Sequence, residues 1–374
     1  MTDEIWLKAY PKDIEWDQSF EVKPLWSILD DAVRRFPNND IIDFLGKTYS
    51  YAEIGHQVDR AAAGFQRLGV GKGTKVGLFL PNCPQFIISY FGILKAGGTV
   101  VNYSPLYSEQ ELLHQIEDSH TDIMVTLNLK VLYPKMKAML AQSRVKKLII
   151  GNMPEVLAFP KNLLFPLFKR GDIAAVPNDK DHVAFAQLVN NDGAYTPAEI
   201  DPATDIAVLQ YTGGTTGVSK GAMLTHANLY ANTMQGRVWF EGVTEGEETM
   251  MGVLPFFHVF AMTVVMNLSI SIAAKIIMHP RFELEPVLKD LDKKKPTLFP
   301  GVPTMYTAIN NYPKLSDYDL SSLKFCLSGG APLPVEVKQN FESFTGCKLV
   351  EGYGLTETSP IASASPLMGV SKEA

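Results

Sequence analysis

The chain has 374 residues, and 46% of them are apolar, which is enough to bury sizeable cores and excludes a globally disordered protein. This length suggests two or three lobes, and the formal net charge of −6 argues against nucleic-acid binding over a broad surface. The cysteines, Cys83, Cys326 and Cys347, lack metal-ligand spacing, so we expect free thiols in a reducing compartment. The start "MTDEIWLKAY" does not resemble a signal peptide, and a cytoplasmic protein is therefore expected.

The first half of the chain alternates between strand-like and helix-like stretches. The clearest example is "KVGLFLPNCPQFIISYFGILKAGGTVV", in which an apolar run is followed by a turn, a helical pattern, two glycines and a second apolar run. The expected elements are strands at 76–80 and from Val100, a helix at 85–95, and further strands at "DIMVTL" and "KKLII". Such alternation predicts a parallel sheet with helices on its faces, and we place this lobe at residues 50–150.

A less regular region follows and contains "LAFPKNLLFPLFKR" at residues 157–170. It combines apolar and aromatic side chains with Lys161, Lys169 and Arg170, and residues 156–171 contain no Asp or Glu. Pro160 and Pro166 argue against one long regular helix. Two interpretations stay open at this point. The segment either dips among lipid head groups or packs between the two lobes.

The second half repeats the alternation from Asp205 onward. Strands are expected at "DIAVLQYT", "AKIIMH", "TLFPG" and "KFCLSGG", with helices at "THANLYANTMQG" and at residues 335–344. Thr225 is the expected N-cap of the first of these helices. Residues 250–274 carry no Asp, Glu, Lys or Arg, but Pro255 and His258 interrupt them, so we expect a buried strand, turn and helix rather than a membrane span. This pattern predicts a second α/β lobe at residues 205–360.

The stretch "YTGGTTGVSKG" has the composition of a phosphate-binding loop. Three threonines, four glycines and one lysine lie within residues 212–221, directly after a strand. Glycines let backbone N–H groups approach an anion, the threonines add hydroxyl donors, and Lys220 adds a positive charge. The order of residues is not that of a Walker A loop, which disfavours a kinase or GTPase. A flexible turn is the alternative, but an ordinary turn needs neither the threonines nor the lysine.

Three further clusters follow strand ends. "GYGLTET" offers Tyr353 as a flat face for a purine, Thr356 as a hydroxyl for a phosphate and Glu357 as an oxygen ligand for Mg²⁺. "LSGGAPLP" opens into glycines, and "LPFFHVFAM" places His258 among apolar residues. Each cluster alone is also compatible with an ordinary turn, and a lone apolar-flanked histidine is more often a core residue.

Together and in this order, these clusters resemble the adenylate-forming superfamily of acyl-CoA synthetases, luciferases and peptide-synthetase adenylation domains. "YTGGTTGVSKG" and "GYGLTET" are the diagnostic pair, and the resemblance covers residues 6–360. The stretches "LPNCPQFIISYFGILKAGGTVVNYSPLYSEQEL" and "PFFHVFAM", with the extra segment at 157–170, are most similar to bacterial long-chain fatty acid–CoA ligases. The resemblance implies an α/β fold of two stacked Rossmann-like lobes, which we divide at residues 1–200 and 201–374.

The resemblance also implies a two-step reaction with ATP, a fatty acid and CoA as substrates and Mg²⁺ as cofactor. A carboxylate attacks the α-phosphate of ATP to give an acyl-adenylate and pyrophosphate, and the CoA thiol then displaces AMP. The implied catalytic residues are Lys220, Thr356 and Glu357, and the implied metal ligands are Glu357 with a hydroxyl of Thr212 or Thr215. The implied nucleotide-binding residues are Thr212, Gly213, Gly214, Thr215, Thr216, Gly217, Lys220, Gly329, Gly330, Ala331, Glu351, Gly352, Tyr353, Gly354 and Thr356. His258, Val259 and Met262 are implied to lie at the acyl site, where Met262 replaces a gating tryptophan found in some long-chain enzymes.

The sequence departs from the family pattern at its end. Relatives continue with a β-barrel lobe, a ribose-binding aspartate and a small mobile domain with the adenylation lysine, and none of these is visible in this chain. We therefore expect a fragment that is inactive or impaired alone. The alternatives that stay open are a medium-chain or aryl acid–CoA ligase, an acyl-AMP ligase, and an inactive nucleotide- and acyl-binding module. Peripheral contact with the inner face of the membrane is a further expectation, and the oligomeric state is open, with a homodimer as one option.

Overall fold

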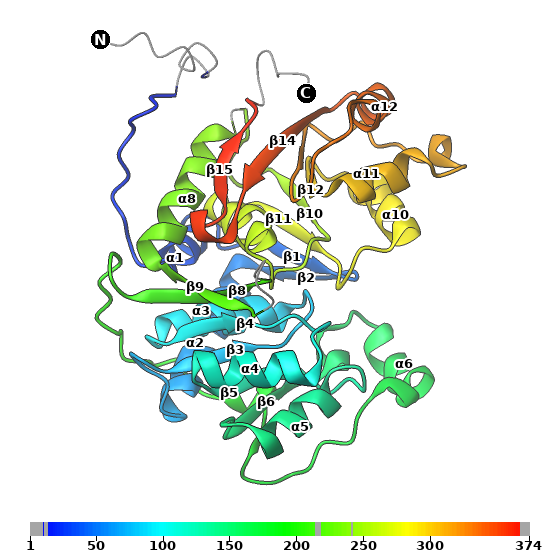
Figure 1. Cartoon of the computed structure of the whole chain (residues 1–374). Coiled ribbons are helices and arrows are strands. Elements are labelled where there is room, and N and C mark those ends of the chain that lie inside the picture. Colours follow the sequence, from blue (N-terminus) through cyan, green and yellow to red (C-terminus); the bar gives the residue numbers. More distant parts are fainter. Residues whose placement is uncertain (1–9, 11–13, 214–217, 241, 367–374) are drawn as a thin grey trace.

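The structure is a computed structural model that describes residues 10, 14–213, 218–240 and 242–366. In the described residues, the strands form a seven-stranded and an eight-stranded sheet, stacked one above the other in Figure 1. The first sheet has the order β7 (His182–Ala184), β6 (Lys147–Gly151), β5 (Thr121–Leu127), β3 (Lys75–Leu78), β4 (Thr99–Asn102), β8 (Ile206–Thr212) and β9 (Lys220–Thr225). The second has the order β15 (Ile361–Ala364), β14 (Lys348–Gly354), β13 (Phe325–Ser328), β12 (Leu298–Gly301), β10 (Thr249–Gly252), β11 (Lys275–Met278), β1 (Asp40–Phe44) and β2 (Lys47–Ser50).

Both sheets are mainly parallel, with an antiparallel hairpin at their edges. In the first sheet only the pairing of β8 with β9 is antiparallel among the described strands, and in the second the pairs β1–β2 and β14–β15 are antiparallel. Parallel strands need crossover helices, which accounts for the alternation seen in the sequence. The α/β class and the pair of Rossmann-like lobes expected from the resemblance are confirmed.

The longer helices lie between and around the sheets. They are α1 (Ser27–Arg35), α2 (Tyr51–Arg67), α3 (Pro84–Lys95), α4 (Glu109–Ser119), α5 (Tyr133–Gln142), α6 (Lys161–Phe168), α8 (His226–Trp239), α10 (Leu284–Lys294), α11 (Pro303–Asn310) and α12 (Val335–Thr345). Shorter helical segments are η2 (Met153–Val156), η3 (Arg170–Asp172), α7 (Phe185–Leu188), the π-helix η4 (Ala261–Asn267), α9 (Leu268–Ser271), η5 (Leu315–Asp317) and η6 (Thr356–Thr358).

Local sequence explains where several helices begin. Ser50 with Glu53 and Ser108 with Glu111 form capping boxes at the starts of α2 and α4. Thr225 caps α8 by accepting a hydrogen bond from the backbone N–H of Asn228, as predicted. Such caps satisfy backbone donors that would otherwise be left unpaired in the first turn.

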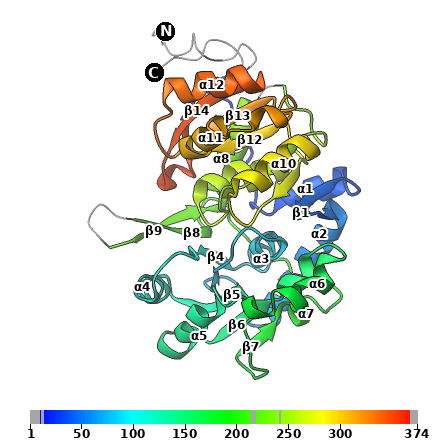
Figure 2. The ribbon, with the colours of Figure 1, turned by 90° about the vertical axis from the view of Figure 1, so that its right-hand side faces the viewer.

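The main core lies between the two sheets and contains α3. Every residue of α3 is buried, although this helix connects two strands of the first sheet. Its Phe86 ring contacts the ring of Phe256, 5.7 Å away, which follows β10 of the second sheet. A second core lies on the other face of the second sheet, where α10, α11 and α12 cover it (Figure 2). The sheets are therefore packed into one body through buried aromatic contacts.

The strands are divided between the sheets differently from the expected division of the sequence. The strand β8, which begins near Asp205, joins the first sheet beside β4, and β1 from the N-terminal region joins the second beside β11. Both strands are largely buried, β1 at four of its five residues and β8 at five of its seven. A buried strand needs neighbours on both sides, and these two strands find theirs in the sheet formed mainly by the other half of the chain. The domain boundary at residue 200 stays a prediction.

The apolar stretch 250–274 forms β10, a turn, η4 and α9, all largely buried. The predicted strand, turn and helix are confirmed. In the residues described, no helix has the length and apolar character needed to cross a bilayer. The three cysteines are free, as expected, and all three are buried.

Candidate active site

A cavity of about 940 Å³ lies where the second sheet, α8 and the N-terminal segment meet. Its walls include residues that follow β10, β12 and β13, and the β14–β15 hairpin. The carboxyl ends of parallel strands are where α/β proteins bind ligands, and a cavity of this size suits a small-molecule substrate. This position makes it the candidate active site.

The predicted nucleotide-binding residues after β13 and in the β14 hairpin line this cavity. They are Gly329, Gly330, Gly352, Tyr353, Gly354 and Thr356. Gly330 has a φ of +80°, which favours glycine, and a Cβ on Gly329 would lie 3.1 Å from the Phe260 ring. The ring of Tyr353 is 68% exposed, so its face is available to a planar ligand. The structure thus brings together two motifs that are separated in the sequence.

Two residues of the same prediction do not line the cavity. Ala331 lies in the turn beyond it, and Glu351 accepts a hydrogen bond from the backbone N–H of Leu333 at 3.0 Å. The carboxylate of Glu351 therefore fixes the turn that carries Gly329 and Gly330. Its role visible in the structure is to hold that wall in place.

The phosphate-loop prediction falls on the β8–β9 hairpin, which projects from the edge of the first sheet in Figure 2. Thr212 at the end of β8 pairs with Lys220 at the start of β9. Gly213 and Lys220 are exposed, whereas Gly214, Thr215, Thr216 and Gly217 lie outside the described residues. The strand β9 approaches η6, which contains Thr356 and Glu357. The hairpin stem and the "GYGLTET" turn therefore face the same region.

Helix α4 anchors both sides of this hairpin. The hydroxyl of Tyr211 donates to the carboxylate of Asp118, and the His114 imidazole contacts the backbone carbonyl of Ser219 at 3.3 Å. Burial, followed by the neighbouring Asp118 carboxylate, raises the pKa of Tyr211, so this phenol stays a donor. The positions 114 and 118 are one helical turn apart, so both contacts come from one face of α4.

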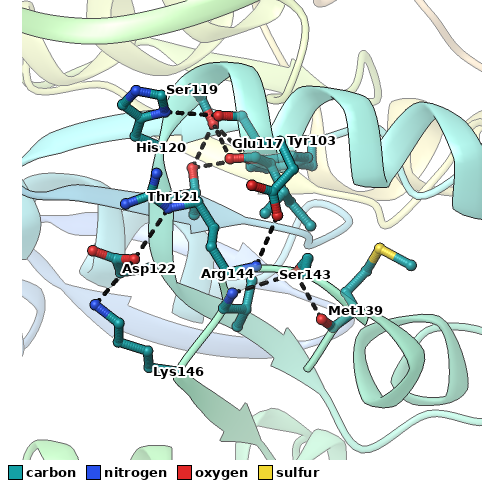
Figure 3. A network of polar contacts seen from close by, with 12 residues as sticks. Tyr103, Glu117, Ser119, His120, Thr121, Asp122, Met139, Ser143, Arg144 and Lys146 are labelled. Atoms are coloured by element: carbon teal, nitrogen blue, oxygen red, sulfur yellow. Dashed lines mark hydrogen bonds and ion pairs between the residues drawn. The ribbon is translucent and has the colours of Figure 1, made fainter. Parts of the chain in front are cut away.

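The C-terminal end of α4 is itself fixed by a polar network, drawn in Figure 3. The hydroxyls of Tyr103, Ser119 and Thr121 contact one another at 2.7–3.0 Å. Glu117 accepts from the backbone N–H of Arg144 at 2.8 Å, and Asp122 pairs with the Arg144 side chain. Because the helix end cannot rotate freely, Asp118 is held where it reaches Tyr211.

Among the predicted metal ligands, Glu357 supplies the carboxylate, and the structure describes it. It is exposed in η6, next to cavity-lining Thr356, and no described residue forms an ion pair with it. Thr212 offers a hydroxyl at the neighbouring hairpin stem. In the described parts of the chain, no group of three or more His, Cys, Asp or Glu residues is arranged to hold a metal ion by itself. A site with one carboxylate suits Mg²⁺ that is held mainly by substrate phosphates.

The predicted acyl-site residues follow β10. His258 and Val259 line the cavity, where His258 is exposed, and partial desolvation of its ring by the surrounding protein lowers its pKa below the usual 6.5. The imidazole is therefore kept neutral near pH 7. Met262 does not line the cavity. It is fully buried, and its sulfur contacts the Asn102 side-chain amide at 3.3 Å.

Sequence reasoning missed the polar pair Gln210 and Asn102. Gln210 lines the cavity, donates to the backbone carbonyl of Phe257 at 2.8 Å and accepts from the Asn102 amide at 2.9 Å. The pair thus links the first sheet to the residue before His258. A glutamine within the apolar strand "IAVLQYT" was the signal that could have revealed it.

Residues of the N-terminal segment were also missed. Tyr10, Trp16 and Phe20 line the cavity, and the Tyr10 ring packs edge-on against Trp239 of α8 with 5.1 Å between centroids. Figure 1 shows this segment running beside α8 before α1 begins. No pattern in the first twenty residues indicated a contact with residues more than 200 positions away.

The chain has relatives among known proteins. It is similar to the long-chain-fatty-acid–CoA ligase of Bacillus subtilis, with 46% identity over 98% of this chain and 66% of that protein. The enzyme of the same name from Yersinia pestis is 32% identical over 97% of this chain and 66% of that protein. The chain thus spans just under two thirds of the length of these relatives.

Solved structures show the same fold at lower identity. A long-chain-fatty-acid-CoA ligase from Archaeoglobus fulgidus superposes with a TM-score of 0.78 at 22% identity, covering 93% of this chain and 67% of that one. An anthranilate CoA ligase in complex with anthranoyl-AMP gives a TM-score of 0.80 at 19% identity, covering 94% and 63%. The family described as AMP-binding enzyme matches residues 29–373. Because the family match covers nearly the whole chain, the chain belongs to the AMP-binding enzyme family.

Proposed function

We propose that this chain is the ATP-binding part of a long-chain fatty acid–CoA ligase. The observation that carries the proposal is a cavity lined by the glycines after β13, by the "GYGLTET" turn and by the His258 turn. The 46% identity to a ligase of that name supports the long-chain substrate. ATP, a fatty acid and CoA are the proposed substrates, and no nucleic-acid partner is proposed.

The proposed reaction has two steps. A carboxylate oxygen of the fatty acid bonds to the α-phosphorus of ATP, and the bond to the bridging oxygen breaks, so pyrophosphate leaves. The CoA thiolate then bonds to the acyl carbon, and AMP leaves with the electron pair of the broken C–O bond. AMP is a good leaving group, whereas a free carboxylate offers none, which is why the first step is needed.

The chain's own residues would position the substrates for this chemistry. Tyr353 would stack on the adenine while Gly329 and Gly330 allow the nucleotide to lie close to the backbone. Thr356 would donate to the α-phosphate, and Lys220 with the threonines and glycines of the loop would bind the other phosphates. Donors fixed in advance around a developing charge stabilise the transition state more effectively than mobile water.

The site also fits the proposed cofactor. Glu357 offers an exposed carboxylate beside Thr356. A hydroxyl of Thr212, or of Thr215 outside the described residues, would be the second ligand. Mg²⁺ bound there would neutralise phosphate charge during transfer. We place the protein in the cytoplasm, with peripheral contact at the inner face of the membrane, because its proposed substrate partitions into bilayers.

The test is ATP–pyrophosphate exchange by the protein extended to the length of its relatives, with a panel of acids. We expect exchange with long-chain fatty acids and little with medium-chain or aryl acids. The variant Glu357→Gln should lose on the order of a hundredfold in exchange rate and need more Mg²⁺, because a neutral amide binds the metal weakly. Exchange with aryl acids only would contradict the substrate, and unchanged Mg²⁺ dependence would exclude the role of Glu357.

A further inference from the structure

Helix α6 presents apolar side chains outward instead of toward a core. None of its residues is buried, and Pro166 lies within it. The exposed side chains form what we call the α6 ridge, namely Phe159, Leu163, Leu164, Leu167 and Phe168. Of the two interpretations of this segment, packing between the lobes does not hold for α6, which lies on the surface at the edge of the molecule in Figure 1.

The spacing of the ridge makes it a continuous surface. Residues 163, 164, 167 and 168 share one helical face, while Phe165 on the other side packs against the core. A surface helix normally directs its polar face to solvent, and here the order is reversed. Leu167 and Phe168 are 74% and 79% exposed, so water contacts most of their surface. Clusters of this kind mark interaction sites.

Cations surround the ridge. Lys161 donates to the backbone carbonyl of Leu45 at 2.9 Å, and Arg170 is exposed in η3. Lys169 approaches Asp172 only at 3.8 Å, with both side chains about 60% exposed, so this pair leaves Lys169 available to other anions. Residues 156–171 contain no Asp or Glu, and the acidic residues on either side of them are Glu155 in η2 and Asp172 in η3. The region is thus basic on a chain whose overall charge is −6.

A neighbouring loop extends this surface. The backbone N–H of Lys130 donates to the carbonyl of Asp172 at 2.8 Å, so the loop lies against η3. Val131 is 74% exposed and Lys130 is exposed as well. A second segment therefore repeats the combination of an apolar side chain and a cation.

We infer that the α6 ridge, with the loop at Lys130 and Val131, docks reversibly on an anionic phospholipid bilayer. Apolar side chains enter the head-group boundary while the lysines and Arg170 meet lipid phosphates. A projecting helix with a basic rim suits a flat, deformable and negatively charged surface. The net negative charge of the rest of the chain keeps the contact local and sensitive to salt. This inference assigns a surface to the membrane contact included in the proposed function, and its test needs no ligase activity.

The test is co-sedimentation with vesicles of phosphatidylcholine alone or with phosphatidylglycerol, at low and moderate salt. The wild-type chain should bind the anionic vesicles and release them as salt rises. The partition coefficient of the double variant Leu167→Ser/Phe168→Ser onto anionic vesicles should be lower than that of wild type, on the order of tenfold or more. Lys169→Glu/Arg170→Glu should lose the preference for anionic lipid. The matched control is Leu106→Ser, a residue 87% exposed on another loop, which should bind like wild type.

Thermal unfolding of each variant verifies that it is folded. Equal sedimentation of wild type and the ridge variant, or none by either, would overturn the proposal. Concentration-dependent dimers that the ridge variant loses, without lipid binding, would assign the surface to a second copy of the chain and would overturn it as well. AMP binding measured on the same samples reports separately on the nucleotide site, so failure of one proposal leaves the other testable.

Discussion

The imidazole of His226 is buried at the start of α8, where its Nδ1 accepts a hydrogen bond from the backbone N–H of Leu25 at 3.0 Å. Burial lowers the pKa of His226 from 6.5 to about 4, against a smaller opposing effect of Asp205. Above pH 6.5 the ring is neutral in both folded and unfolded chains. As the pH falls below 6.5, the unfolded chain takes up a proton that the folded chain refuses. Stability is therefore lost between about pH 6.5 and pH 4.

We expect this histidine to lower the free energy of unfolding by about 2 kcal/mol between pH 7 and pH 5. In His226→Gln the amide oxygen can accept the hydrogen bond from the backbone N–H of Leu25, and it does not titrate. The variant's free energy of unfolding should therefore fall by about 2 kcal/mol less than that of wild type between pH 7 and pH 5. Urea unfolding at the two pH values measures the difference. The control His56→Gln changes an exposed histidine and keeps His226, so it should follow wild type. An equal loss of stability in wild type and His226→Gln would reject the explanation.

Individual residues show which parts of the candidate site could be predicted from the sequence. Tyr353, Thr356 and Gly330 come together at one cavity, because short motifs at strand ends fix their neighbours directly, and their nucleotide contacts stay predictions. Glu351 belongs to the same motif, but its carboxylate holds the turn at Leu333. That contact joins two segments whose approach depends on strand order. Motif matching alone could not distinguish a ligand contact from a supporting one.

At the scale of elements, the β14–β15 hairpin depends on a glycine at a position too close to the opposite backbone for a side chain. A Cβ on Gly354 would lie 2.1 Å from the backbone carbonyl oxygen of Pro360, far inside contact distance. Leu355 donates its backbone N–H to the same oxygen at 3.2 Å. The close approach therefore sets the geometry of the turn that carries Thr356 and Glu357.

The variant Gly354→Ala should open this hairpin and cost about 2 kcal/mol of stability, because backbone cannot move aside as a side-chain end can. We expect AMP binding, measured by calorimetry, to weaken on the order of tenfold or more, since each tenfold change corresponds to about 1.4 kcal/mol. Gly71→Ala is the control, because its Cβ would meet nothing within 4 Å. That control should keep both stability and binding. Normal binding by Gly354→Ala would show that the hairpin adapts.

Element types were largely predictable, and element partners were not. Hydrophobic periodicity and capping residues correctly indicated α3, α8 and α12, with α8 extending to Trp239. The helix α6 formed despite Pro166, since a short helix can lose one backbone hydrogen bond near its end. Pairing of β1 with β11 joins residues more than 200 positions apart, and periodicity carries no signal for such pairings.

At the scale of the whole molecule, nucleotide binding and catalysis should separate. In the described residues, the glycines after β13 and the "GYGLTET" turn line one cavity, so we expect measurable but weak AMP binding by the isolated chain. It spans 66% of the length of its Bacillus subtilis relative, and only one loop lysine, Lys220, is proposed near the phosphates. Transition-state charge needs stabilisation from more than one side. We therefore expect pyrophosphate exchange at least about a hundredfold slower than by the protein at the relatives' full length.

Calorimetry with AMP and an exchange assay on the same preparation measure the two properties. A folded chain that binds no AMP would contradict the first expectation. Exchange at the rate of the longer protein would contradict the second, because the residues described here would then suffice for the chemistry.

Each sheet contains a strand from the other half of the chain, and this limits the order in which the chain can fold during synthesis. The strand β1 leaves the ribosome early but pairs with β11, so it must wait until residue 278 has emerged. The first sheet cannot be finished before β8 and β9 emerge, with β9 ending at Thr225. An apolar strand without its partner is prone to aggregation while it waits. Cutting the gene at the apparent lobe boundary should therefore give two pieces that each lack strands, and the pieces should become soluble when they are produced together.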